Sequence, residues 1–63
     1  MADIGWLYAR KIEASAIMVE VDGMRAENAS RSMQGHSLSY GESAFQRKAD
    51  ELRSISEDIV RNR

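Results

Sequence analysis

His36 is the only histidine of the 63-residue chain, and it is followed closely by the hydroxyl groups of Ser37, Ser39 and Tyr40. A histidine beside a serine is the start of a nucleophilic site, but catalysis also needs a third orienting group and an oxyanion hole. No pattern in the sequence marks either of these, and serines in such a stretch commonly serve turns and helix caps. We therefore expect His36 to be a solvated loop residue, and the sequence nominates no catalytic residue.

Glu13, Glu20 and Glu27 recur at heptad spacing, with Asp22 among them. Carboxylates on successive turns of a helix can hold a metal ion, but bundle metal sites often include a Glu-x-x-His pair, which is absent here. The chain also has no cysteine, which excludes disulfides and thiolate ligands. Glutamates at this spacing are typical of a polar seam of solvated or interhelical ion pairs. We expect no metal site and no cofactor.

Basic residues give the C-terminal third of the chain a component that could contact nucleic acid. They are Arg47, Lys48, Arg53, Arg61 and Arg63. A nucleic-acid interface usually carries a basic stripe with little acid on the same face. Here Asp50, Glu51, Glu57 and Asp58 are interleaved with the basic residues, and the net charge is -1. Nucleic-acid regulation through basic residues of paired helices is therefore the alternative function.

Trp6, Leu7 and Tyr8 could form a membrane-surface anchor, but only Arg10 and Lys11 lie near them, and the segment lacks one strongly charged face. No apolar run approaches the roughly 20 residues that span a bilayer. The N-terminal residues also lack the basic start and apolar core of a signal peptide. We expect a buried protein contact for the aromatic residues, no membrane association, and a soluble cytoplasmic protein.

The composition indicates an all-α protein, because proline is absent and good helix formers dominate. Asp3 is suited to cap the start of a first helix, and Gly35 is suited to end it in the left-handed conformation. Ser39 followed by Glu42 has the spacing of a capping box for a second helix.

These signals predict one domain, residues 1–63, folded as an antiparallel two-helix hairpin. The helices are expected at about 4–34 and 40–61, with a loop at about 35–39. Residues that face each other across such a pair have numbers that sum to roughly 74. The first turns of the longer first helix should then extend past the end of the second.

The Asp22-Gly23 pair is a turn signal inside a run of helix formers. A break there would leave a short strand or helix end before it and a separate helix after it. The helical period continues across the glycine, which favours one continuous helix in which Gly23 makes room for Leu52. A glycine inside a helix costs about 1 kcal/mol relative to alanine.

The first helix has two apolar faces, and one second helix cannot cover both. We expect the face with mostly small residues to pack within the chain, because large residues of the second helix would fall opposite them. This predicts an intrachain core of Ile12, Ala16, Val19, Gly23, Ala26, Phe45, Ala49, Leu52, Ile55 and Ile59. The other face is then the expected oligomer interface, formed by Trp6, Leu7, Ala14, Ile17, Met18, Val21 and Met24.

A chain this short buries only about 60% of its unfolded surface, so it generally needs a further source of stability. Without cysteine or a histidine cluster, oligomerisation is the expected source. We therefore expect a non-enzymatic helical interaction protein, an adaptor, regulator or assembly subunit, that forms a homodimeric four-helix bundle. A tetramer, or another protein supplying the same surface, fits the pattern equally well.

Overall fold

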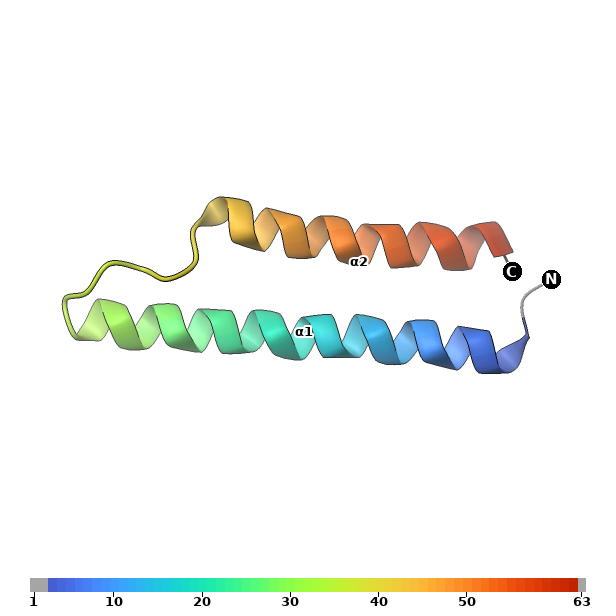
Figure 1. Ribbon diagram of the computed structural model, residues 1–63, viewed down its shortest axis with the longest axis horizontal. Helices are drawn as coiled ribbons and strands as arrows, with labels where there is room; N and C mark the ends of the chain where they lie inside the picture. Colours follow the sequence, from blue (N-terminus) through green and yellow to red (C-terminus); the bar gives the residue numbers. More distant parts are fainter. Residues whose placement is uncertain (1–2, 63) are drawn as a thin grey trace.

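The structure, a computed structural model, describes residues 3–62, which form two long helices joined by a loop (Figure 1). Helix α1 spans Ile4–Met33 and helix α2 spans Glu42–Asn62. The helices run antiparallel and side by side, so that the start of α1 lies near the end of α2 (Figure 1). The predicted all-α hairpin is confirmed. Neither of these two helices is both long enough and apolar enough to cross a membrane.

Both ends of α1 follow local capping signals. The Oδ1 atom of Asp3 accepts a hydrogen bond from the backbone N–H of Trp6 at 2.7 Å, which satisfies one of the free donors at the helix start. After the helix, Gly35 adopts a φ of 76°, and the N–H of His36 donates to the carbonyl of Arg31 at 2.8 Å. This is the left-handed termination that glycine allows at low cost.

Helix α1 continues through Asp22 and Gly23 without interruption, so the predicted continuous helix is confirmed and the alternative of a break at this pair is wrong. The predicted role of Gly23, to make room for Leu52, is wrong. A Cβ atom at Gly23 would meet nothing within 4 Å, so the glycine makes room for no side chain of its own chain. Its cost of about 1 kcal/mol to the helix is therefore not offset by any contact within the hairpin.

Helix α2 begins at Glu42, which makes the predicted capping box wrong, since the glutamate opens the helix instead of lying three residues inside it. The carbonyl of Gly41 instead accepts from the N–H groups of Ala44 and Phe45, at 3.1 and 3.4 Å. The segment before it is held by Asn28 of α1, whose side-chain amide hydrogen-bonds both backbone groups of Tyr40. This contact across the hairpin sets where α2 can start.

Two ion pairs across the hairpin fix its register. Arg10 Nε lies 3.2 Å from Asp58 Oδ2, and Lys48 Nζ lies 2.5 Å from Glu20 Oε1. The residue numbers of each pair sum to 68, not to the predicted 74 or so. The difference arises because the loop, residues 34–41, runs back beside the last turns of α1 instead of turning at once (Figure 1).

The predicted overhang of the first turns of α1 is consequently wrong. Trp6 and Leu7 are half-buried, and the first turns of α1, to which they belong, lie beside the end of α2 (Figure 1). The part of α1 that extends past α2 is its C-terminal end, which lies beside the loop (Figure 1). The hairpin is long and narrow, with Cα extents of 51 × 18 × 9 Å.

Candidate interaction surface

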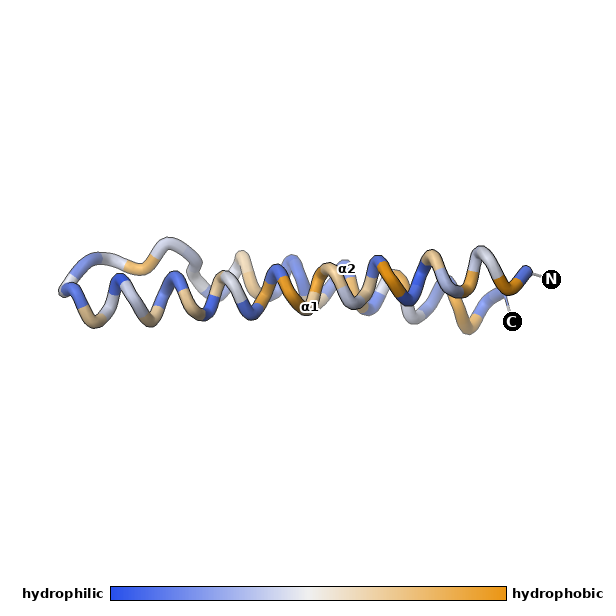
Figure 2. The backbone as a smooth tube through the Cα atoms, turned by 90° about the horizontal axis from the view of Figure 1, so that it is seen from below, coloured by the Kyte–Doolittle hydropathy of each residue, from blue (hydrophilic) through white to orange (hydrophobic). Residues whose placement is uncertain are grey.

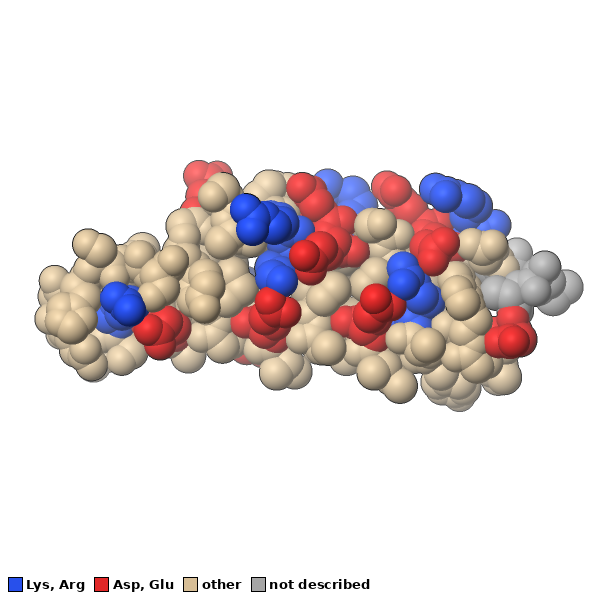
Figure 3. Space-filling model, viewed as in Figure 1, with Lys and Arg blue, Asp and Glu red and all other residues tan. Residues whose placement is uncertain are grey.

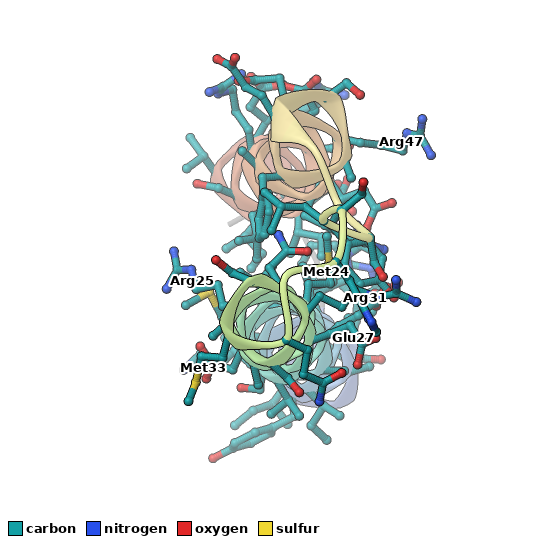
Figure 4. The ribbon with its side chains drawn as sticks, turned by 90° about the vertical axis from the view of Figure 1, so that its left-hand side faces the viewer. Met24, Arg25, Glu27, Arg31, Met33 and Arg47 are labelled. Carbon is teal, nitrogen blue, oxygen red and sulfur yellow. The ribbon has the colours of Figure 1, made fainter. Side chains whose placement is uncertain are left out.

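One side of α1 faces α2 and forms the inner row of the hairpin. Its members are spaced alternately three and four residues apart, and all are buried or half-buried: Leu7, Arg10, Ala14, Ile17, Val21, Met24, Asn28 and Arg31. Met24 is the most buried of them, with 5% of its surface exposed. Figure 4 shows its side chain directed from α1 toward α2. This spacing is that of a packed seam between nearly parallel helix axes.

Helix α2 contributes a matching row with the same spacing: Phe45, Lys48, Leu52, Ile55 and Ile59. Ile55 is 5% exposed, and the other four are half-buried. Among the described residues, Met24 and Ile55 are the only two that are buried and not merely half-buried. The contact between the helices is therefore one seam, without a second layer around it.

The opposite side of α1 is an exposed apolar surface, which we call the outer face. It is a second row with heptad spacing: Ala9, Ile12, Ala16, Val19, Gly23, Ala26, Ser30 and Met33. Every member is exposed, and Ile12, Val19 and Met33 are exposed by 69, 71 and 88%. In Figure 4 Met33 points away from α2. A contiguous exposed apolar strip of this kind is a candidate interaction surface.

The charged side chains are arranged away from the outer face. In Figure 3 they gather mainly over the contact between the helices and over α2, whereas the lower margin of α1 is formed largely by uncharged residues. Figure 2, which looks at the hairpin from that lower side, shows hydrophobic residues recurring along α1 up to the end next to the loop. The outer face contains no ionisable residue.

The predicted assignment of the two faces of α1 is reversed in the structure. Five residues expected in the intrachain core are exposed: Ile12, Ala16, Val19, Gly23 and Ala26. Six expected at an oligomer interface are buried or half-buried in the hairpin: Trp6, Leu7, Ala14, Ile17, Val21 and Met24. Met18 is exposed, as is Ala49 of α2, which was expected in the core.

The physical reason for the reversal is side-chain size. Burial stabilises roughly in proportion to the apolar area removed from water, at about 25 cal/mol per Å². Ile17, Val21 and Met24 offer more such area to α2 than Ala16, Gly23 and Ala26 do. Packing the inner row against α2 also brings Arg10 to Asp58. If the outer face had packed against α2 instead, Arg10 would have lain outside the seam.

One edge of the outer face is formed by Glu13, Glu20 and Glu27, and each glutamate has a cation beside it. Arg10 Nη1 lies 2.6 Å from Glu13, and Arg31 Nε lies 2.9 Å from Glu27. Glu20 pairs with Lys48 of α2. Of the expected interhelical ion pairs, only that of Glu20 with Lys48 joins the two helices, whereas Glu13 and Glu27 pair within α1. The charge of this edge is locally compensated.

Lys48 is the centre of the polar contact between the helices. Its ammonium lies between Glu20 of α1 and Glu51 of α2, at 2.5 and 3.5 Å. The hydrogen bond to Glu20 raises the pKa of Lys48 above its ordinary value of 10.5, and both carboxylates add to the shift, against a smaller effect of burial. Lys48 therefore remains charged wherever the hairpin is folded near neutral pH.

The other candidate sites are dispersed. His36 is exposed in the loop, and Ser37 and Ser39 are exposed with it. In residues 3–62, no three histidine or carboxylate side chains gather in a way that could hold a metal ion. An open groove between the helices is lined by charges of both signs, among them Arg10, Arg47 and Asp50.

The basic residues of α2 do not form one separate surface. Lys48 and Arg53 each lie within salt-bridge distance of a carboxylate, Arg53 at 3.1 Å from Asp50. Arg63, the last residue of the proposed basic set, lies outside the described residues. On the described part of the chain, the surface with the most uniform chemical character is therefore the apolar outer face of α1.

Comparison of the chain with protein-family models, with curated proteins and with solved structures finds no match.

Proposed function

We propose that this chain is a small, non-enzymatic interaction protein of the cytoplasm, an adaptor, regulator or assembly subunit that acts as a homo-oligomer. The observation that supports the proposal is the outer face of α1, a row of apolar residues with the spacing of a helix–helix seam and no helix against it. The oligomer interface is placed on this face, because the face expected from the sequence is occupied by α2.

The dimensions of the single chain support the proposal. A compact chain of 63 residues has a radius of gyration of about 11 Å, whereas this hairpin has one of 15.2 Å. Its accessible surface is 4907 Å², against about 4,100 Å² for a compact monomer of the same mass. The surplus of about 800 Å² is close to the area that one partner contributes to a standard protein–protein interface.

The small core of the hairpin also supports association with a second copy. A seam in which only Met24 and Ile55, among the described residues, are buried supplies little of the apolar burial that offsets conformational entropy. No disulfide can add to it, since the chain has no cysteine. Association through the outer face would bury Ile12, Val19 and Met33, which the hairpin leaves in water.

The proposal is tested by the molar mass in solution, measured by size-exclusion chromatography with light scattering over a range of concentrations. We expect a dimer or higher oligomer at micromolar concentration and a smaller species for Val19→Glu. Val60→Glu is the matched control, because Val60 is an exposed valine of α2. A folded wild-type monomer throughout the range would overturn the proposal.

A further inference from the structure

The outer face has an internal order that specifies how a second copy would lie on it. Its eight positions form two sub-rows, each with heptad spacing. One contains only small residues: Ala9, Ala16, Gly23 and Ser30. The other contains the three large residues and one alanine: Ile12, Val19, Ala26 and Met33. Small and large residues thus run in parallel strips along the same face.

We infer that two copies of this chain pair through α1 in antiparallel orientation, with the two-fold axis on the outer side of α1 at the level of residue 21. This inference rests on the proposed function and adds the orientation and register of the homo-oligomer. In this register, facing residues have numbers that sum to 42. In an antiparallel pair, the strip of small residues on each helix lies against the strip of large residues on the other. The two-fold axis makes the two halves of the interface identical.

Three of the four kinds of layer in this interface then join a large residue to a small one, and the fourth joins two alanines. Ile12 lies opposite Ser30 of the second copy, and Val19 lies opposite its Gly23. The remaining layers join Met33 to Ala9 and Ala16 to Ala26. Alternating large and small side chains across facing positions is how helices interdigitate at native packing density.

A parallel pair lacks this complementarity. It would place Gly23 against Gly23, which leaves a gap, and Ile12 against Ile12, which holds the helices apart at that layer. Helix axes in contact lie 8–10 Å apart according to the side chains between them. The antiparallel register avoids both the layer of two glycines and the layer of two isoleucines.

Gly23 is an independent observation in favour of a close neighbour at the outer face. It is helical, it is exposed, and a Cβ atom there would meet nothing in its own chain within 4 Å. In the antiparallel register it faces Val19 of the second copy next to the two-fold axis. A residue without a Cβ atom allows the backbone of a neighbouring helix to approach closely.

The charged edge is compatible with this arrangement. Glu13 of one copy meets the edge near Glu27 of the other, but Arg10 and Arg31 accompany these glutamates. Two ion pairs therefore meet across the edge instead of two bare carboxylates. The outer face spans residues 9–33, or about 36 Å of helix at 1.5 Å per residue, and its length suits a surface of about 800 Å².

The absence of cysteine allows a direct test by disulfide trapping. Ala16 and Ala26 are exposed, and each tolerates a change to cysteine without loss of a large side chain. In the antiparallel register, Ala16→Cys of one copy lies opposite Ala26→Cys of the other. Two copies of the same variant hold their sulfurs about 15 Å apart along the axis, well beyond the reach of a disulfide.

We expect a mixture of the two variants to form several-fold more disulfide-linked dimer than either variant alone. Ser43→Cys, an exposed position on α2, gives the background from random collisions. Linkage of each variant with itself would show a parallel pair and overturn the inference. Light scattering on the same samples separates the two proposals. A dimer that no pair links would overturn the register alone, whereas a monomer would overturn the proposed function with it.

Discussion

The side-chain amide of Asn28 forms two hydrogen bonds with the backbone of Tyr40. Its Nδ2 donates to the Tyr40 carbonyl at 2.8 Å, and its Oδ1 accepts from the Tyr40 N–H at 3.0 Å. A carboxamide is the side-chain group that offers a donor and an acceptor side by side. It therefore satisfies both backbone groups of a loop residue and holds the loop against the last turns of α1.

Asn28→Ala should lower the free energy of unfolding by about 1–3 kcal/mol, since each of two hydrogen bonds contributes roughly 0.5–1.5 kcal/mol net. Urea denaturation followed by circular dichroism, at one fixed chain concentration, measures the change. Gln46→Ala is the control, because the amide of Gln46 donates to Asp50 within α2. Equal losses in both variants would mean that the contact with Tyr40 is not what fixes the loop.

The helices themselves were predictable because their signals are local. Asp3 caps α1 and Gly35 ends it, and both depend only on residues within one turn. The start of α2 was predicted less well, because Asn28 of the other helix competes with the local signal of Ser39. A contact between residues far apart in the sequence does not appear in a local pattern.

The choice between the two faces of α1 was the main failure of prediction. Both faces have heptad spacing, and the inner row is interrupted by Arg10, Asn28 and Arg31, which made it look less like a seam. In the structure these polar residues make specific contacts, Arg10 with Asp58 and Asn28 with Tyr40. The prediction matched large residues of α2 with small residues of α1, whereas the structure packs the bulkier residues of both helices against each other and so buries more apolar area.

Met24 and Met18 provide a direct test of that assignment, since both are methionines of α1 that were expected on one face. Met24 is 5% exposed and Met18 is 50% exposed. Met24→Ala should cost about 2–5 kcal/mol through lost burial and a cavity. Met18→Ala should change stability by no more than about 0.5 kcal/mol.

Thermal denaturation of both methionine variants at equal concentration makes the comparison. If Met24→Ala unfolds the hairpin completely, Met24→Leu should restore it, since the two side chains have similar volume. Equal stability of Met24→Ala and Met18→Ala would contradict the inward packing of Met24.

Lys48 should contribute stability that is lost in alkali. Its pKa is raised in the folded hairpin, first by the hydrogen bond to Glu20, so the contribution is fully present below the unfolded value of 10.5. It disappears as the pH rises through the folded pKa. The stability difference between wild type and Lys48→Met should therefore shrink above pH 10.5.

Urea midpoints of wild type and Lys48→Met, measured well below and well above that pH, give the difference. Lys11→Met is the control, because Lys11 lies 5.9 Å from the ring centre of Tyr8 and is exposed. A difference for Lys48→Met that stays constant across this range would show that the packing of its stem matters and its charge does not.

Gly23→Ala separates the hairpin from its association with a second copy. Within the hairpin the new Cβ meets nothing within 4 Å, so the substitution should stabilise α1 by up to about 1 kcal/mol through helix propensity. In the antiparallel pair the same Cβ would meet Val19 of the second copy. Overpacking at such a close contact should weaken dimerisation by about 1–3 kcal/mol.

The two effects have opposite signs and are measured separately. Circular dichroism at the lowest usable concentration reports the helix, and sedimentation equilibrium reports the dimer. Gly5→Ala is the control, because Gly5 lies in the first turn of α1, where the facing number would be 37, past the end of the second copy's α1 at Met33; this change should alter the helix only. If Gly23 only weakens its own helix, Gly23→Ala should raise both the helix content and the strength of dimerisation. A dimer strengthened by Gly23→Ala would therefore show that no second helix lies against this position.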